Sequence, residues 1–179
     1  MTEAIKILKN GGVGVVPTDT LYGLCASVFS RAAVERIYDL KSRTETKPFI
    51  ILIASSHDLA AFGITLSTDE CTFLDTVWPG PVSVILPCKL EKFEYVHRGT
   101  QSLAFRMPKS PKLHEFLSKT GPLVAPSANP QGLAPAHTIA EAKKYFGDAV
   151  DFYIPGGRKE GKPSKIVSLV SGTPVVVRA

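Results

Sequence analysis

Apolar residues recur at intervals of three and four in five segments of the chain, a spacing that places them on one face of an α-helix. Ser67 with Glu70, and Thr138 with Glu141, have the spacing of a capping box, in which two side chains satisfy backbone N–H groups at a helix start. The pattern predicts helices over residues 2–9, 30–41, 67–78, 110–117 and 138–146.

Short apolar runs bounded by turn residues predict β-strands between these helices. The run 49–54 is continuously apolar, which is typical of a strand buried on both faces. The full set of predicted strands is 13–16, 24–28, 49–54, 82–86, 103–106, 123–125, 151–154, 166–170 and 174–177. Because helices and strands are mixed without strict alternation, we expect an α/β fold, a twisted open mixed sheet with flanking helices, in one domain over residues 1–179.

The composition is that of an ordinary soluble protein, with 44% hydrophobic and 21% charged residues among 179. No apolar run approaches the length of a membrane span, and the N-terminus lacks the pattern of a secretory signal. Cys25, Cys71 and Cys88 are odd in number and widely spaced, which argues against a disulfide framework and a zinc site. We therefore expect a cytoplasmic protein without a resident metal.

The charges are segregated along the chain, whose formal net charge is +5. Residues 48–88 contain no Lys or Arg, whereas basic residues gather in 41–47, 89–119 and 143–165. A segregated positive face favours an anionic partner such as a nucleotide, a phosphate or RNA. A solvated basic surface remains the commoner explanation for any single cluster.

A polar loop, residues 17–23 (PTDTLYG), lies between the first two predicted strands. Pro17 at the start of the loop fixes one backbone angle, and Gly23 at its end allows backbone angles that other residues avoid. The hydroxyls of Thr18 and Thr20 and the phenol of Tyr22 therefore predict a cradle for a small polar molecule at a strand end.

Three cations, Lys41, Arg43 and Lys47, precede the buried strand that begins after Pro48. Cations at a helix C-terminus are commonly explained by the helix dipole alone. Their convergence beside a strand end favours anion binding instead, since Arg43 can grip a phosphate through two N–H groups and Lys41 supplies a point charge.

A second polar loop, residues 126–130, carries Ser127 and Asn129 between two prolines. These side chains suit either a rigid ligand-binding loop or an ordinary turn, and the local pattern does not decide between them. Arg106 ends a strand before Pro108 and is a candidate clamp for a carboxylate, although a surface ion pair is the commoner role.

The segment 156–162 has the G-x-x-x-x-G-K spacing of a P-loop, but Pro163 stands where Ser or Thr should open a helix. We reject a P-loop and expect a glycine-rich basic loop able to cover phosphates. The four histidines show no metal spacing, and no nucleophile motif is present. Cations, hydroxyls and amides fit charge stabilisation and positioning, the requirements of nucleotidyl transfer.

Five motifs together resemble the YrdC/Sua5 family of threonylcarbamoyl-adenylate synthases, in the short single-domain form. They occur in the family's order and cover nearly the whole chain, at residues 17–23, 41–43, 78–81, 106–108 and 126–129. The resemblance implies a twisted open α/β sheet with a basic concave face. It also implies a reaction in which L-threonine, bicarbonate and ATP yield threonylcarbamoyl-AMP and pyrophosphate, from which a downstream transferase modifies adenosine 37 of certain tRNAs.

The same resemblance implies roles for individual residues. Lys41 and Arg43 would be catalytic, and the threonine and carbamate would contact Thr18, Thr20, Tyr22 and Arg106. ATP, with Mg²⁺ carried on it, would be bound by Lys41, Arg43, Lys47, Ser127, Asn129, Ser164 and Arg178.

Two alternatives stay open from the sequence. The basic clusters suit a non-catalytic protein that binds double-stranded RNA or tRNA, although no aromatic stacking platform is evident. A carbamoyl-adenylate-forming relative of hydrogenase maturation uses a related domain, and its longer architecture counts against it.

Overall fold

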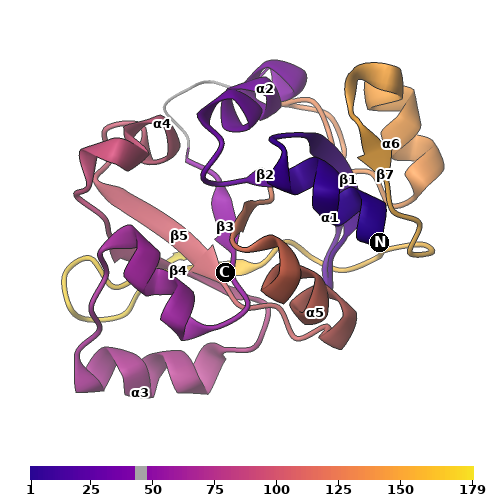
Figure 1. The fold of residues 1–179 in the computed structure, drawn as a ribbon. Coiled ribbons are helices and arrows are strands. Elements are labelled where there is room, and N and C mark those ends of the chain that lie inside the picture. Colours follow the sequence, from indigo (N-terminus) through magenta and orange to yellow (C-terminus); the bar gives the residue numbers. More distant parts are fainter. Residues whose placement is uncertain (43–47) are drawn as a thin grey trace.

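A single mixed β-sheet organises the computed structural model, which describes residues 1–42 and 48–179 (Figure 1). Arg43 and Lys47 lie outside the described residues. The strands are β1 (Val13–Pro17), β2 (Tyr22–Ser27), β3 (Ile50–Leu52), β4 (Val82–Pro87), β5 (Ser102–Arg106), β6 (Leu123–Val124), β7 (Phe152–Tyr153), β8 (Lys165–Ser168) and β9 (Val175–Arg178).

The strand order is β7-β1-β2-β6-β3-β5-β4-β8-β9. The pairs β1–β7, β3–β5 and β4–β8 are parallel, and the remaining pairs are antiparallel. The predicted fold class, an open mixed α/β sheet with flanking helices, is confirmed. Strands neighbouring in space are often distant in sequence, which brings separate loops to one edge.

All five predicted helices are present, and one further short helix is added. They are α1 (Thr2–Lys9), α2 (Arg31–Lys41), α3 (Thr68–Val77), α4 (Glu94–His97), α5 (Pro111–Thr120) and α6 (Ile139–Phe146). Three 3-10 turns at Ser56–Phe62, Glu91–Phe93 and Gly147–Ala149 were not predicted. Segments this short carry too few residues for a helical period to show in the sequence.

The two predicted capping boxes have different outcomes. At α3 the Ser67 hydroxyl accepts from the Glu70 N–H and the Glu70 carboxylate accepts from the Ser67 N–H, as predicted. At α6 the Thr138 hydroxyl accepts from the Glu141 N–H, but the Glu141 carboxylate accepts from the N–H of His137. In the second predicted capping box, the carboxylate of Glu141 therefore accepts from the residue before Thr138 and not from Thr138 itself.

The sheet is covered on both faces. Val15 belongs to the buried cluster that contains Val34 of α2, and the next residue, Val16, belongs to the cluster that contains Leu8 of α1 and Leu113 of α5. Successive residues of a strand point to opposite faces, so α2 packs on one side and α1 with α5 on the other. This double cover explains the continuously apolar strands of the sequence.

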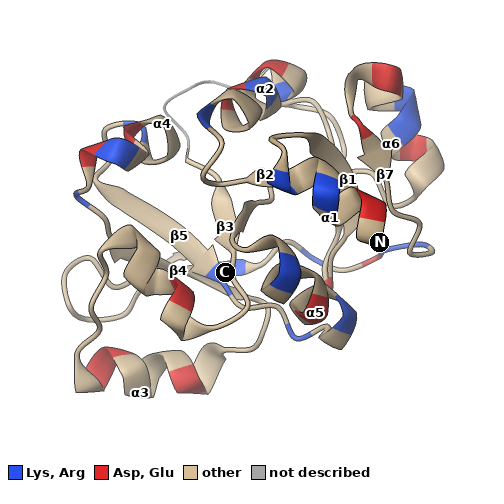
Figure 2. Cartoon of the chain, viewed as in Figure 1, with Lys and Arg blue, Asp and Glu red and all other residues tan. Residues whose placement is uncertain are grey.

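Charged residues are unevenly placed on the fold (Figure 2). Helix α3 carries acidic residues without Lys or Arg, whereas α5 and α6 each carry two lysines, Lys112, Lys119, Lys143 and Lys144. The basic concave face stays a prediction. Among the described helices, none has both the length and the apolar character needed to cross a membrane.

Candidate functional site

A pocket of about 220 Å³ opens where several strands end. Its wall includes apolar residues such as Phe49, Pro135 and Ile166. It also includes seven of the eleven predicted site residues, namely Thr18, Thr20, Tyr22, Arg106, Ser127, Ser164 and Arg178. Side chains up to 160 residues apart in the chain thus converge on one small space, as the sequence analysis expects of a binding site.

The loop between β1 and β2 is held in shape by Thr18. Its buried hydroxyl donates to the carbonyl of Leu21 (2.6 Å) and accepts from the N–H groups of Thr20 (3.2 Å) and Leu21 (3.1 Å). The hydroxyl of Thr20 lies 3.1 Å from it. Thr18 therefore closes the turn, and Thr20 shares this hydroxyl network at the pocket wall.

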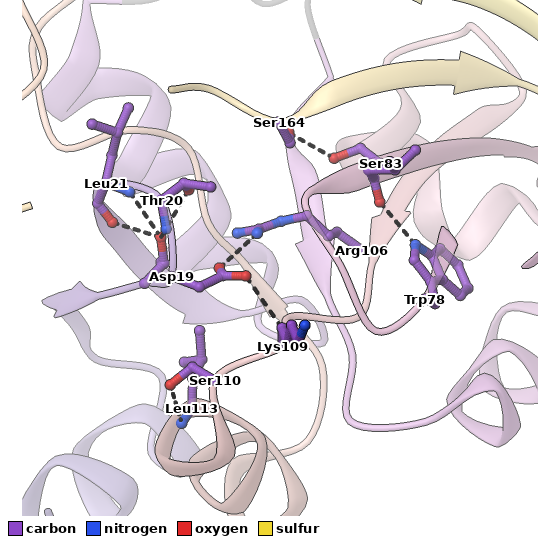
Figure 3. A network of polar contacts seen from close by, with 12 residues as sticks. Asp19, Thr20, Leu21, Trp78, Ser83, Arg106, Lys109, Ser110, Leu113 and Ser164 are labelled. Carbon is purple, nitrogen blue, oxygen red and sulfur yellow. Dashed lines mark hydrogen bonds and ion pairs between the residues drawn. The ribbon is translucent and has the colours of Figure 1, made fainter. Parts of the chain in front are cut away.

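Arg106 meets Asp19 at the edge of the pocket (Figure 3). Its Nη1 donates to Asp19 Oδ1 at 2.6 Å, and Asp19 Oδ2 accepts from the N–H of Lys109 at 3.2 Å. The Arg106 side chain is only 5% exposed. Within residues 1–42 and 48–179, no other partner engages its remaining N–H groups, so the guanidinium is oriented yet keeps donors available for a ligand.

Tyr22 fastens the glycine-rich segment to the opening loop. Its phenol donates to the carbonyl of Gly157 (2.7 Å) and accepts from the N–H of Gly156 (3.0 Å), and the ring is buried. The N–H of Gly161 donates to the carbonyl of Thr20 (3.1 Å), and a Cβ on Gly161 would lie 2.5 Å from that oxygen. Glycine is therefore required at 161 by the close approach of two backbones.

Tyr22→Phe is expected to lower the free energy of unfolding by about 0.5–1.5 kcal/mol, because two part-buried hydrogen bonds between the phenol and the segment 156–157 are lost. Urea denaturation of the variant measures this. Tyr145→Phe is the matched control, since the Tyr145 phenol donates to a backbone carbonyl at an exposed place (Ala134, 3.0 Å). Equal, small effects of both changes would contradict a fastening role for Tyr22.

Lys41 and Asn129 stand behind the pocket wall. Lys41 is 2% exposed, and its ammonium donates to the carbonyls of Ser127 (2.5 Å) and Asn129 (2.6 Å). Asn129 Nδ2 donates to the carbonyls of Pro130 and Leu133. These bonds hold the loop 126–130: the Asn129 amide closes its own turn, as the ordinary-turn alternative expects, whereas Ser127 lines the pocket.

Ser164 and Arg178 form the opposite wall. Arg178 donates from Nε (3.1 Å) and Nη2 (2.6 Å) to the carbonyl of Ser164. Partial burial lowers the pKa of Arg178 from its ordinary value, and no carboxylate pairs with it in the described part of the chain. A partly desolvated cation without an acidic partner favours the binding of an anion.

The cysteine thiols are free, and the possible metal ligands are not clustered, among the described residues. Burial raises the pKa of the Cys25 thiol to about 12, so that the reactive thiolate is disfavoured. No group of three His, Cys, Asp or Glu residues in the described ranges is arranged to hold a metal ion. The arrangement is suited to binding anions and orienting them.

Two residues of the site were missed in the sequence. The sequence shows Asp19 in the opening loop without indicating its role, because its partner Arg106 lies 87 positions away and no local pattern connects the two. Ser83, which contacts Ser164, stands inside an apolar strand and resembles any other strand residue. A carboxylate flanked by two threonines was the one signal available for Asp19.

Comparisons with known proteins identify the family of this chain and several of its relatives. Residues 6–179 match the family model Sua5_yciO_yrdC, described as "Telomere recombination". A relative from Halorhodospira halophila named threonylcarbamoyl-AMP synthase is 34% identical over 155 residues, covering 86% of this chain and 81% of the relative. A second, from Marinobacter nauticus and with the same name, is 36% identical and covers 90% and 87% of the two chains. The crystal structure of P. abyssi Sua5 complexed with L-threonine has a TM-score of 0.90 at 29% identity, covering 98% of this chain and 52% of that one.

Proposed function

Because the chain belongs to the Sua5/YciO/YrdC family, we propose that it is a threonylcarbamoyl-AMP synthase, a nucleotidyltransferase that uses L-threonine, bicarbonate and ATP. The observation that carries the proposal is the pocket, which gathers hydroxyls and two arginines from five separate segments. We assign residues 1–179 to one domain that bears this site.

The proposed reaction needs two bond-forming steps. The threonine amine adds to bicarbonate with loss of water and gives a carbamate. A carbamate oxygen then attacks the α-phosphorus of ATP, while the bond from that phosphorus to the oxygen bridging to the β-phosphorus breaks. Negative charge grows on the phosphoryl oxygens and on the departing pyrophosphate, so positioned cations and N–H or O–H donors lower the barrier.

We assign the amino acid to the side of the pocket formed by residues 17–23 and Arg106. Arg106 supports this because its uncommitted N–H groups suit the threonine carboxylate. Thr18 and Thr20 shape this wall, and Tyr22 contributes its ring while its phenol is engaged with the segment 156–157.

We assign ATP to the other side, at Ser127, Ser164 and Arg178. The pocket of about 220 Å³ is smaller than the roughly 300–1,000 Å³ usual for a ligand site, so ATP would extend beyond it. Lys41 and Asn129 would act there with Arg43 and Lys47, two cations outside the described residues. Mg²⁺ would arrive bound to ATP, since it keeps several of its ligands from phosphates and water.

The product, a mixed anhydride of a carbamate and AMP, is reactive. We propose that a downstream transferase passes its threonylcarbamoyl group to tRNA in the cytoplasm. Weak binding of tRNA or double-stranded RNA would then be a secondary property. A purely RNA-binding role leaves the hydroxyl- and arginine-lined pocket without a use.

Purified protein with Mg²⁺ and ATP is expected to release pyrophosphate only when threonine and bicarbonate are both present. Mass spectrometry should detect threonylcarbamoyl-AMP in the same reaction. Carbamoyl phosphate in place of threonine and bicarbonate is the control for the carbamoyl-adenylate alternative. Pyrophosphate release with carbamoyl phosphate alone, or no release under any condition, would contradict the proposal.

A further inference from the structure

Two buried serine hydroxyls, those of Ser83 and Ser164, form a hydrogen bond at one edge of the pocket. Ser83 lies on β4 and is fully buried, and Ser164, 5% exposed, directly precedes β8, which pairs with β4 in parallel. Their Oγ atoms are 2.9 Å apart (Figure 3). Ser164 lines the pocket and Ser83 does not, so the Ser83 hydroxyl acts on the site through its hydrogen bond with Ser164.

The surroundings decide which hydroxyl donates. Among the described residues, Ser164 Oγ is the hydrogen-bond partner of Ser83 Oγ and no second one is present. A buried hydroxyl that donates to nothing is costly. Ser83 therefore donates its proton to Ser164, since the opposite direction would leave the Ser83 proton without an acceptor.

Ser164 Oγ receives a second donor from the other side. Arg178 Nη2 lies 3.5 Å from it, while the same nitrogen donates to the Ser164 carbonyl at 2.6 Å. Arginine has no acceptor, and a serine hydroxyl offers two acceptor positions and one proton. With donors on both acceptor positions, the Ser164 proton is left for a group in the pocket.

We propose that Ser83 is a positioning residue that keeps Ser164 a hydrogen-bond donor to an anionic oxygen of the substrate. Together Ser164 and Arg178 present donors, which selects an anion over a neutral or cationic group. The inference rests on the proposed function for the identity of that anion. A phosphate oxygen of ATP and the carboxylate of threonine share the required chemistry, and binding measurements separate them.

Isothermal titration of ATP and, separately, of L-threonine into the full-length protein tests the proposal. Ser83→Ala is expected to weaken the binding of one of the two ligands about 10-fold, because the hydroxyl of Ser164 is no longer oriented to donate to that ligand. Ser83→Thr keeps the hydroxyl and should restore affinity to within about 3-fold of the original chain. Ser168→Ala on β8 is the matched control, since its hydroxyl accepts from the N–H of Val170 at 3.3 Å and Ser168 does not line the pocket.

A double-mutant cycle separates positioning from mere packing. If Ser83 acts through Ser164, Ser83→Ala should add almost nothing to the loss caused by Ser164→Ala. Additive losses, or unchanged affinity for both ligands in Ser83→Ala, would overturn the proposal, as would failure of the original chain to bind either ligand. A chain that binds with this coupling yet forms no pyrophosphate would refute the proposed function and leave the Ser83 inference standing.

Discussion

Replacing Arg106 by alanine is expected to raise the KM for L-threonine about 100-fold while the KM for ATP changes by less than about 3-fold. Losing a charged hydrogen-bonding partner from a desolvated site costs roughly 2–5 kcal/mol of binding, which spans this fold-change. The prediction follows from the proposed contact between the free N–H groups of Arg106 and the threonine carboxylate. Steady-state pyrophosphate release with each substrate varied in turn measures it.

The Asp19–Arg106 pair requires controls, because removal of the arginine also leaves a carboxylate unpaired. Asp19→Asn keeps the size of the side chain and removes its charge, and we expect it to weaken threonine binding less than Arg106→Ala does. Arg36→Ala is the matched arginine control, since Arg36 pairs with Asp151 at 2.7 Å outside the pocket. A selective rise in the KM for ATP would instead assign Arg106 to the nucleotide.

Lys41→Met is expected to lower kcat on the order of 100-fold, the effect of removing one positioned charge contact from a reaction of this type. It should also lower the free energy of unfolding by about 2 kcal/mol, because the carbonyls of Ser127 and Asn129 lose a buried donor. Pyrophosphate release and urea denaturation measure the two effects.

Lys119→Met is the control for Lys41→Met, since Lys119 pairs with Glu115 on the exposed side of α5 and should change neither quantity. A Lys41→Met protein with normal stability and a large loss of kcat would show that the charge itself acts on the reaction. A variant with lowered stability but normal kcat would contradict a catalytic role and leave Lys41 as a support of the loop.

The fold was largely predictable from the sequence because strand and helix periods depend on local residues. The apolar run 49–54 and the capping residue Ser67 identified their elements directly. The short helix α4 was not predicted, because four residues are too few for a helical period to show in the sequence. The family resemblance identified five motifs, and three of them, at residues 17–23, 106–108 and 126–129, contribute residues to the pocket wall.

The interactions inside the site were much harder to predict. That Tyr22 holds the segment 156–157 and that Lys41 holds the loop 126–130 depends on which strands become neighbours. A sequence shows that a phenol or an ammonium is present but not which backbone carbonyl it will meet across the sheet. Hydrogen bonds between distant loops therefore needed the structure.

The strand order has a mechanical consequence for the pocket. The loop that carries Thr18 and Thr20 leads into β2, and Ser164 precedes β8, with β6, β3, β5 and β4 lying between the two strands. If each pairing turns the strand direction by the usual 20–25°, five pairings accumulate roughly 100° of twist between the pocket's two walls. The sheet is thus the frame that sets the spacing of the pocket's two walls, and with it the spacing of the substrates proposed to bind there. Core substitutions that flatten or overwind the sheet would therefore lower the rate of the proposed reaction, although they change no residue that lines the pocket.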